Sequence, residues 1–191
     1  MKVLGINGSP NKNGNTSLLI KAVFHELEKE GIETESINIA LKPIRGCKAC
    51  FKCLKNQNKR CVFDDDIVNE CIGKMAVADG IILGSPTYFT NVTAEMKALI
   101  DRAGMVSLTN GGLFKHKVGS SVVAVRRAGA INTFDTMNHF LHYMQMFLVG
   151  ASYLNMGFGF AAGEVNDDKE GMENMKTLGE NMTYLLKKIN S

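Results

Sequence analysis

The chain carries, at residues 3–17, the stretch VLGINGSPNKNGNTS, in which a buried strand, a polar loop and a helix start follow one another directly. Val3–Ile6 is a short apolar run of the kind that is buried on both faces of a parallel sheet. A turn rich in Gly, Ser, Pro and Asn ends it, and an amphipathic helical pattern runs from Ser17 to Lys29. Strand, loop and helix in this order predict the first unit of an α/β fold.

The rest of the chain repeats this unit. We expect further strands and helices, in alternation, at about 33–39, 64–78, 80–83, 93–103, 118–125, 131–149, 152–156 and 171–189. Such alternation predicts a doubly wound parallel sheet with helices on both faces. No linker or repeat interrupts the pattern, so we predict one domain over 1–191 with a cysteine-rich insertion at about 44–63.

The bulk composition is that of an ordinary globular protein, with 191 residues, 45% hydrophobic and 21% charged, and a net charge of +3. This weak charge gives no reason to expect nucleic acid or a membrane as partner. No apolar stretch approaches the ~20 residues that span a bilayer, and the apolar run after Met1 is too short for a signal peptide. With an odd count of five cysteines, these features predict a protein of the reducing cytoplasm.

Four of the cysteines lie within fifteen residues, at Cys47, Cys50, Cys53 and Cys61. Disulfides between such close neighbours would close only tiny loops. Clustered thiolates are typical ligands of zinc or of an iron–sulfur cluster, and unligated or redox-active thiols are the remaining alternative. The spacing leaves this choice open. Cys71 differs, because it lies in a helical apolar pattern and is expected in the core.

The loop after the first predicted strand, Gly8–Ser17, is dense in hydroxyls and amides and leads into a helix N-terminus. Its backbone amides, with the hydroxyls of Ser9, Thr16 and Ser17, would cradle a phosphate. The loop has neither the Gly-Lys-Ser/Thr ending of a Walker A sequence nor a G-x-G-x-x-G turn. With little cationic help, it suits one terminal phosphomonoester better than a triphosphate.

Two later loops would meet the first at the same edge of the sheet, where open parallel sheets bind ligands. Ser85–Asn91 holds Tyr88 and Phe89 beside a proline, which suits the face and polar rim of a flat heterocycle. Arg126–Ala130 opens with two arginines, which suit a second anion or a negatively charged ring.

The blocks Gly8-Ser9-Pro10…Gly14-Asn15-Thr16-Ser17 and Gly84-Ser85-Pro86-Thr87-Tyr88 resemble the FMN sites of the NADPH-dependent FMN reductase group of the flavodoxin-like superfamily. With the four clustered cysteines, the chain is most similar to the iron–sulfur flavoproteins of that group. The resemblance implies a five-stranded sheet in the order 2-1-3-4-5, FMN at its carboxyl edge, and a homodimer or homotetramer. It also implies a set of FMN contacts, to the phosphate from Ser9, Asn11, Asn15, Thr16 and Ser17, and to the isoalloxazine from Pro86, Thr87, Tyr88, Phe89 and Asn91.

In these relatives a compact cysteine motif carries a 4Fe–4S cluster that exchanges electrons with FMN, which would make Cys47, Cys50, Cys53 and Cys61 its ligands. Arg126 and the backbone of Gly129 would face the flavin. No general base is expected, because flavin chemistry needs little from side chains. The expected function is an FMN-dependent oxidoreductase of the iron–sulfur flavoprotein type, with ferredoxin or NAD(P)H as the electron donor. The alternatives are a cluster-free NAD(P)H-dependent FMN or quinone reductase and a flavodoxin-like electron carrier.

Overall fold

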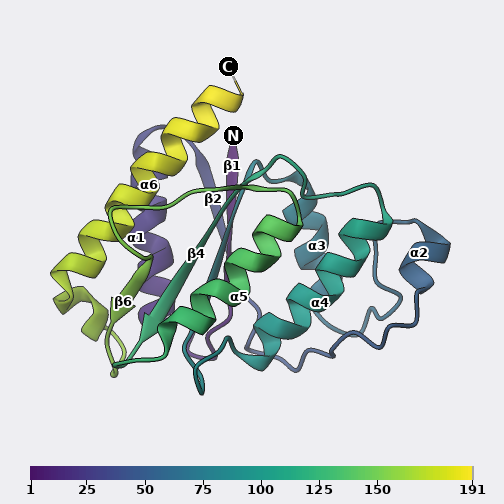
Figure 1. Ribbon diagram of the computed structural model, residues 1–191, viewed down its shortest axis with the longest axis horizontal. Helices are drawn as coiled ribbons and strands as arrows, with labels where there is room; N and C mark the ends of the chain where they lie inside the picture. The colour runs from purple at the N-terminus through teal and green to yellow at the C-terminus, as the bar shows by residue number, and fades with distance from the viewer. Residues whose placement is uncertain (191) are drawn as a thin grey trace.

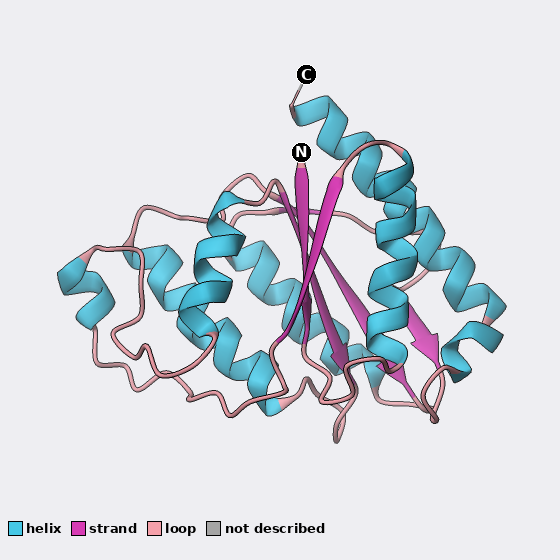
Figure 2. Cartoon of the chain, turned by 180° about the vertical axis from the view of Figure 1, so that it is seen from behind, coloured by secondary structure: helices cyan, strands magenta, loops and turns pink. Residues whose placement is uncertain are grey.

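A parallel sheet forms the centre of the computed structural model, which describes residues 1–190 (Figures 1 and 2). In spatial order it contains β2 (Glu33–Asn38), β1 (Lys2–Asn7), β3 (Gly80–Pro86), β4 (Val118–Val125) and β5 (Phe147–Leu148). The short β6 (Met156–Phe158) also pairs with β4. This confirms the predicted order 2-1-3-4-5 and the flavodoxin-like doubly wound class.

Helices cover both faces of the sheet. In Figure 1, α1 (Asn15–Lys29) and α6 (Lys169–Ile189) lie on one face, and α3 (Val68–Val77), α4 (Ala94–Thr109) and α5 (Ala130–Tyr143) lie on the other. Each layer buries its own apolar cluster against the sheet. The central strands β1, β3 and β4 are almost wholly buried, which explains their continuous apolar sequence. The continuous apolar sequence of these three strands therefore follows from their burial on both faces of the sheet.

The fifth sheet position differs from its prediction. The predicted helix over 131–149 ends at Tyr143, and Gln145 in the left-handed region (φ 59°) turns the chain into β5. The predicted strand over 152–156 is wrong, because β5 and β6 pair with opposite ends of β4 while residues 149–155 form a connection. The side chain of Asn174 on α6 holds this connection by accepting a hydrogen bond from the Tyr153 N–H (2.9 Å) and donating one to the Leu154 carbonyl (2.8 Å).

The cysteine-rich insertion leaves the sheet after β2 and returns to it at α3. It contains the one-turn helix α2 (Lys52–Asn56), which lies beyond α4 at the far end of the molecule in Figure 1. A 3-10 turn, Glu164–Asp167, precedes α6. Among residues 1–190, no helix is both long and apolar enough to cross a membrane.

Candidate functional site

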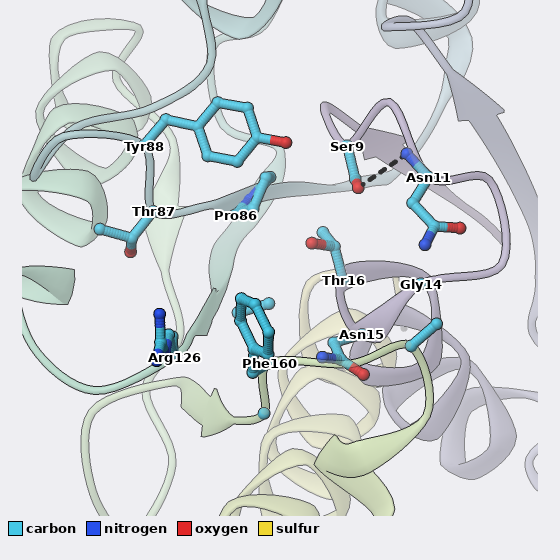
Figure 3. Close-up of a pocket in the computed structure, with 13 residues that line it drawn as sticks. Ser9, Asn11, Gly14, Asn15, Thr16, Pro86, Thr87, Tyr88, Arg126 and Phe160 are labelled. Atoms are coloured by element: carbon cyan, nitrogen blue, oxygen red, sulfur yellow. Dashed lines mark hydrogen bonds between the residues drawn. The ribbon is translucent and has the colours of Figure 1, made fainter.

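A pocket of about 870 Å³, including space open to solvent, lies where the loops after β1, β3, β4 and β6 meet (Figure 3). We call it the sheet-edge pocket. The chain segments that line it are far apart in sequence, and its residues are Ser9, Asn11, Gly14, Asn15, Thr16, Pro86, Thr87, Tyr88, Ala124, Arg126, Gly159, Phe160 and Ala162.

One end of the sheet-edge pocket has the chemical groups of an anion-binding site. The loop is folded by the Ser9 hydroxyl, which accepts a hydrogen bond from the Asn11 N–H (3.2 Å; Figure 3), and by a 3.1 Å bond from the Gly14 N–H to the Asn11 carbonyl. Helix α1 then begins with no side-chain cap and no acidic residue in its first turn. Its first N–H groups therefore lack the capping oxygen that most helices provide, and a phosphate would supply one.

Thr93, the N-cap of α4, joins this loop to the loop after β3. Its hydroxyl donates to the Gly8 carbonyl (2.8 Å), and its own N–H donates to the Ser85 hydroxyl (3.1 Å). Thr93 is almost completely buried. The Gly8 N–H also donates directly to the Gly84 carbonyl (2.8 Å), so Thr93 and this bond together hold the two loops side by side.

The other end of the sheet-edge pocket is lined by Pro86, Thr87 and Tyr88. The Thr87 N–H donates to the Ala124 carbonyl (2.9 Å), which fixes the loop to β4. The Thr87 hydroxyl is buried without a hydrogen-bond partner among the described residues. A buried unpaired hydroxyl costs free energy, so a ligand atom that pairs with it is favoured. A heterocycle with a polar rim fits this end.

Residues 88–91 form a tight turn closed by two hydrogen bonds between Tyr88 and Asn91 (2.9 and 3.0 Å). Its central residues, Phe89 (φ 47°) and Thr90 (φ 64°), both occupy the left-handed region without being glycine. Such conformations cost about 1–3 kcal/mol each and concentrate at functional sites. The Phe89 ring is fully exposed and projects away from the protein.

The wall that sequence analysis missed is the segment after β6. Gly159, Phe160 and Ala162 line the sheet-edge pocket, and the Arg126 guanidinium lies 4.4 Å from the centre of the Phe160 ring. The Glu164 carboxylate accepts hydrogen bonds from the N–H groups of Phe160 (2.6 Å) and Ala161 (2.9 Å), which lower the pKa of that carboxyl. The glycine-rich run at 157–163 was the available signal for such a loop.

Asn15 has an unexpected role. Its side-chain oxygen accepts hydrogen bonds from the N–H groups of Gly163 (2.9 Å) and Val165 (3.4 Å), and its Nδ2 donates to the Ala161 carbonyl (3.0 Å). The amide therefore supports the missed wall, although Asn15 also lines the pocket as expected.

The structure brings most of the predicted FMN contacts together in the sheet-edge pocket. Those that line it are Ser9, Asn11, Asn15, Thr16, Pro86, Thr87, Tyr88 and Arg126. Four predicted contacts lie outside its lining, namely Ser17, Phe89, Asn91 and Gly129. Asn91 closes the turn described above, and Gly129 adopts a left-handed conformation (φ 85°) as the N-cap of α5. Contact of all twelve residues with a flavin stays a prediction.

The four clustered cysteines line a second pocket of about 340 Å³, including space open to solvent, which we call the cysteine pocket. Cys47 and Cys50 are exposed, Cys61 is partly buried and Cys53 is buried. The remaining lining is mostly apolar, with Phe51, Phe63, Met105 and Val106 among its residues, and also includes Lys48 and Arg102. Within residues 1–190, no three His, Cys, Asp or Glu side chains converge closely enough to hold a single metal ion. Four thiols around a shared space are a donor set that suits a multi-iron centre.

The backbone of the cysteine segment is strained. Ala49 (φ 48°), Phe51 (φ 53°), Gln57 (φ 45°) and Lys59 (φ 60°) all lie in the left-handed region without being glycine. The Ala49 N–H donates to the Cys47 sulfur at 3.4 Å. A loop that bends this sharply between closely spaced thiols resembles a ligand-holding loop more than a solvated one.

Cys71 stands apart, as predicted. It is completely buried in the core on α3, and burial raises the pKa of its thiol to about 12. His139 and His142, which the sequence placed on the predicted helix over 131–149, are exposed on α5 and do not line either pocket.

Comparisons with known proteins agree with this geometry. The sequence profile described as NADPH-dependent FMN reductase matches residues 1–161. An iron–sulfur flavoprotein of Methanocaldococcus jannaschii is 39% identical and covers 99% of both chains. Another iron–sulfur flavoprotein, from Methanosarcina thermophila, is 34% identical and covers 99% of this chain and 97% of its own. A WrbA-like flavodoxin structure from Agrobacterium tumefaciens has a TM-score of 0.64 at 15% identity, with 98% of each chain covered, and supports the fold.

Proposed function

From the premise that this chain belongs to the NADPH-dependent FMN reductase family, we propose that it is an FMN-dependent oxidoreductase of the iron–sulfur flavoprotein type. The observation that carries the proposal is the sheet-edge pocket, which has uncapped helix N–H groups at one end and an unpaired buried hydroxyl at the other. These are the chemical complements of a phosphate and of a heterocycle's polar rim. FMN carries both groups in one molecule.

FMN, when bound, supplies the chemistry that joins two-electron and one-electron transfer. The residues of the chain bind and orient it. The first N–H groups of α1 and the Ser9 loop would hold the phosphate, and the Thr87 hydroxyl would donate to the ring's polar rim. Arg126, held over Phe160, would offset negative charge on the reduced ring. Pro86, Tyr88 and Phe160 would cover the ring and exclude water.

For the cysteine pocket we propose a 4Fe–4S cluster held by Cys47, Cys50, Cys53 and Cys61. Four thiols that surround one space without converging on a point support a cluster over a single zinc ion. The two full-length relatives named above are iron–sulfur flavoproteins, which supports the same reading. A cluster in a flavoprotein would also give the thiols a redox role, whereas zinc would give them none.

The electron donor that we propose is ferredoxin, with NAD(P)H as the second candidate. Residues 44–63 contain six Lys or Arg residues and no Asp or Glu, and all six are exposed. Lys52 and Lys55 flank Cys53 on α2. A basic rim of this kind favours encounter with an acidic electron carrier. The whole chain has a net charge of only +3, so attraction of an acidic carrier would depend on the basic residues concentrated in this segment.

We also propose a homodimer or homotetramer in which a neighbouring subunit covers the sheet-edge pocket. Large apolar side chains are exposed around its mouth, with Tyr88 at 50%, Phe160 at 70% and Phe89 fully exposed. Apolar rims of this kind mark interaction sites more often than bare solvent surface. Light scattering on the FMN-loaded protein would test this, and a monomer at all concentrations would contradict it.

One anaerobic purification tests the main proposal. FMN reconstitution should give the flavin's two visible absorbance bands, and their absence would remove the oxidoreductase assignment. Iron and acid-labile sulfide in equal amounts, lost in Cys50→Ala and retained in Cys71→Ala, would support the cluster. A flavin-bearing protein without iron would instead favour the cluster-free reductase. Bleaching of the flavin by NADPH rather than by reduced ferredoxin would make NAD(P)H the favoured donor in place of ferredoxin.

A further inference from the structure

Arg102 is a completely buried cation with no role in the function proposed above. It lies on α4 and lines the cysteine pocket. Isolated charges are almost never buried so fully, because the loss of hydration costs several kcal/mol. A buried arginine therefore needs either complete pairing or a ligand.

The pairing of Arg102 is extensive on one side. Nη1 forms a buried ion pair with Asp66 and donates to the Arg45 carbonyl (3.1 Å), and Nη2 donates to the Phe63 carbonyl (2.7 Å). Arg45 and Phe63 stand at the two ends of the cysteine segment. One guanidinium thus clamps both ends of the loop that presents the four thiols.

The third nitrogen of the guanidinium is different. Nε is buried and has no hydrogen-bond partner within residues 1–190. Cys61, one of the proposed ligands, lines the same pocket as Arg102. An unpaired donor on a side chain that lines the cysteine pocket suits an acceptor there.

The ion pair between Arg102 and Asp66 has a defined orientation relative to the cysteine pocket. Arg102 lines the cysteine pocket, whereas Asp66 does not, so the pair presents its positive end to the thiols. Lys48 is the other cation in the lining, but it is exposed and its charge is screened by solvent. Apolar neighbours such as Phe63 and Val106 leave the field of Arg102 less screened.

We propose that Arg102 is a positioning residue of the cysteine pocket that clamps the ligand loop and raises the reduction potential of the cluster bound there. The inference rests on the proposed cluster. Reduction adds one electron, and hence one negative charge, to the cluster, with no bond made or broken. A fixed positive charge and an N–H donor beside the sulfurs stabilise that added charge, and both are known determinants of cluster potential.

The test is a redox titration of the cluster, followed by electron paramagnetic resonance with dithionite as the reductant. Arg102→Lys keeps a charge but removes Nε and the planar fork, and we expect the one-electron reduction equilibrium to become about tenfold less favourable, a fall of about 59 mV. Asp66→Asn leaves the cation uncompensated and should raise the potential. The double variant, Asp66→Asn with Arg102→Gln, removes both charges, so no buried charge is left without its partner. Its reduction potential should fall below that of the wild type.

Lys97→Gln is the matched control, because Lys97 lies on the same helix as Arg102 but is exposed and does not line the cysteine pocket. Its potential should stay at the wild-type value. Shifts of opposite sign in Asp66→Asn and in the double variant would not arise from a loosened loop alone. Cluster-loaded variants with the wild-type potential would overturn the role of Arg102. A wild-type protein that binds no iron and sulfide would instead remove the proposed cluster, and the two failures are separable by iron analysis.

Discussion

The side-chain oxygen of Asn15, at the start of α1, accepts a hydrogen bond from the backbone N–H of Gly163 at 2.9 Å, across 148 residues of sequence. This contact joins the phosphate end of the sheet-edge pocket to the wall that carries Phe160. The phosphate end and the Phe160 wall of the proposed FMN site are thereby coupled through one amide.

Asn15→Ala should weaken FMN binding by up to about thirtyfold, because two good hydrogen bonds to the 161–163 segment are lost at ~1 kcal/mol net each and the wall loosens. Quenching of FMN fluorescence on binding measures this dissociation constant. Asn13→Ala is the control, since Asn13 is exposed in the same loop and lies outside the pocket lining, so it should leave the constant unchanged. Equal affinity in wild type and Asn15→Ala would show that the amide is irrelevant to the site.

Thr87→Val should act in opposite directions on the free and the FMN-bound protein. Removal of an unpaired buried hydroxyl should leave the FMN-free protein equally or slightly more stable, while FMN affinity falls about three- to tenfold through loss of one hydrogen bond. Thermal melting and FMN titration separate the two effects. Thr133→Val removes another unpaired buried hydroxyl, away from the pocket, and should change stability only. A Thr87→Val protein with unaltered affinity would contradict the proposed contact.

Phe89→Asn with Thr90→Gly should raise the melting temperature, because both residues tolerate the left-handed conformation that Phe89 and Thr90 now adopt. Relief of ~1–3 kcal/mol of strain corresponds to several degrees for a domain of this size. If the exposed Phe89 ring contacts a neighbouring subunit, the same variant should dissociate more readily in light scattering. No change in melting temperature would mean that the turn is not strained.

Asp66 should make the cysteine segment sensitive to acid. Burial acts to raise the pKa of its carboxyl, but the Arg102 ion pair and N–H donors from Val68 and Arg45 hold it below the ordinary 3.8. Since the folded-state pKa is the lower one, the stabilisation is complete above the unfolded-state value and is lost as the pH falls below it. Urea unfolding of the cluster-free protein from about pH 6 to about pH 3 should follow this dependence.

Asp66→Asn should remove part of that pH dependence and cost about 3–5 kcal/mol at neutral pH, because it leaves Arg102 buried without a counter-ion. Asp65→Asn is the matched control. Asp65 pairs with Arg45 at 3.3 Å on the exposed surface, where an ion pair contributes less than ~1 kcal/mol. Equal losses of stability in the two variants would refute the distinction between a buried and a surface pair.

The five thiols should divide sharply in their reactivity. In cluster-free protein at about pH 8, iodoacetamide should modify the exposed Cys47 and Cys50 within minutes. Cys71 should stay unmodified until the protein unfolds, since it is buried and its pKa of about 12 keeps it protonated. Peptide mass spectrometry reads each site separately, and early labelling of Cys71 would contradict its placement in the core.

The sequence by itself determined the features that are local in the chain. The first strand, its polar loop and α1 are contiguous, so hydrophobic period and turn chemistry were enough to predict them. The loop after β3 and the clustered cysteines were found for the same reason. Alternation predicted the doubly wound parallel sheet, whereas the order of its strands came from the resemblance to the flavodoxin-like superfamily.

Tertiary structure alone decided what depends on distant contacts. The helix expected to reach 149 ends at Tyr143, and after the left-handed turn at Gln145 the chain pairs Phe147 and Leu148 with β4, a distant strand. Asn15 supports a segment 148 residues away, and Arg102 clamps a loop through a carbonyl 57 residues away. No local pattern encodes such partners, because a buried polar group is satisfied by whichever donor or acceptor the fold brings to it.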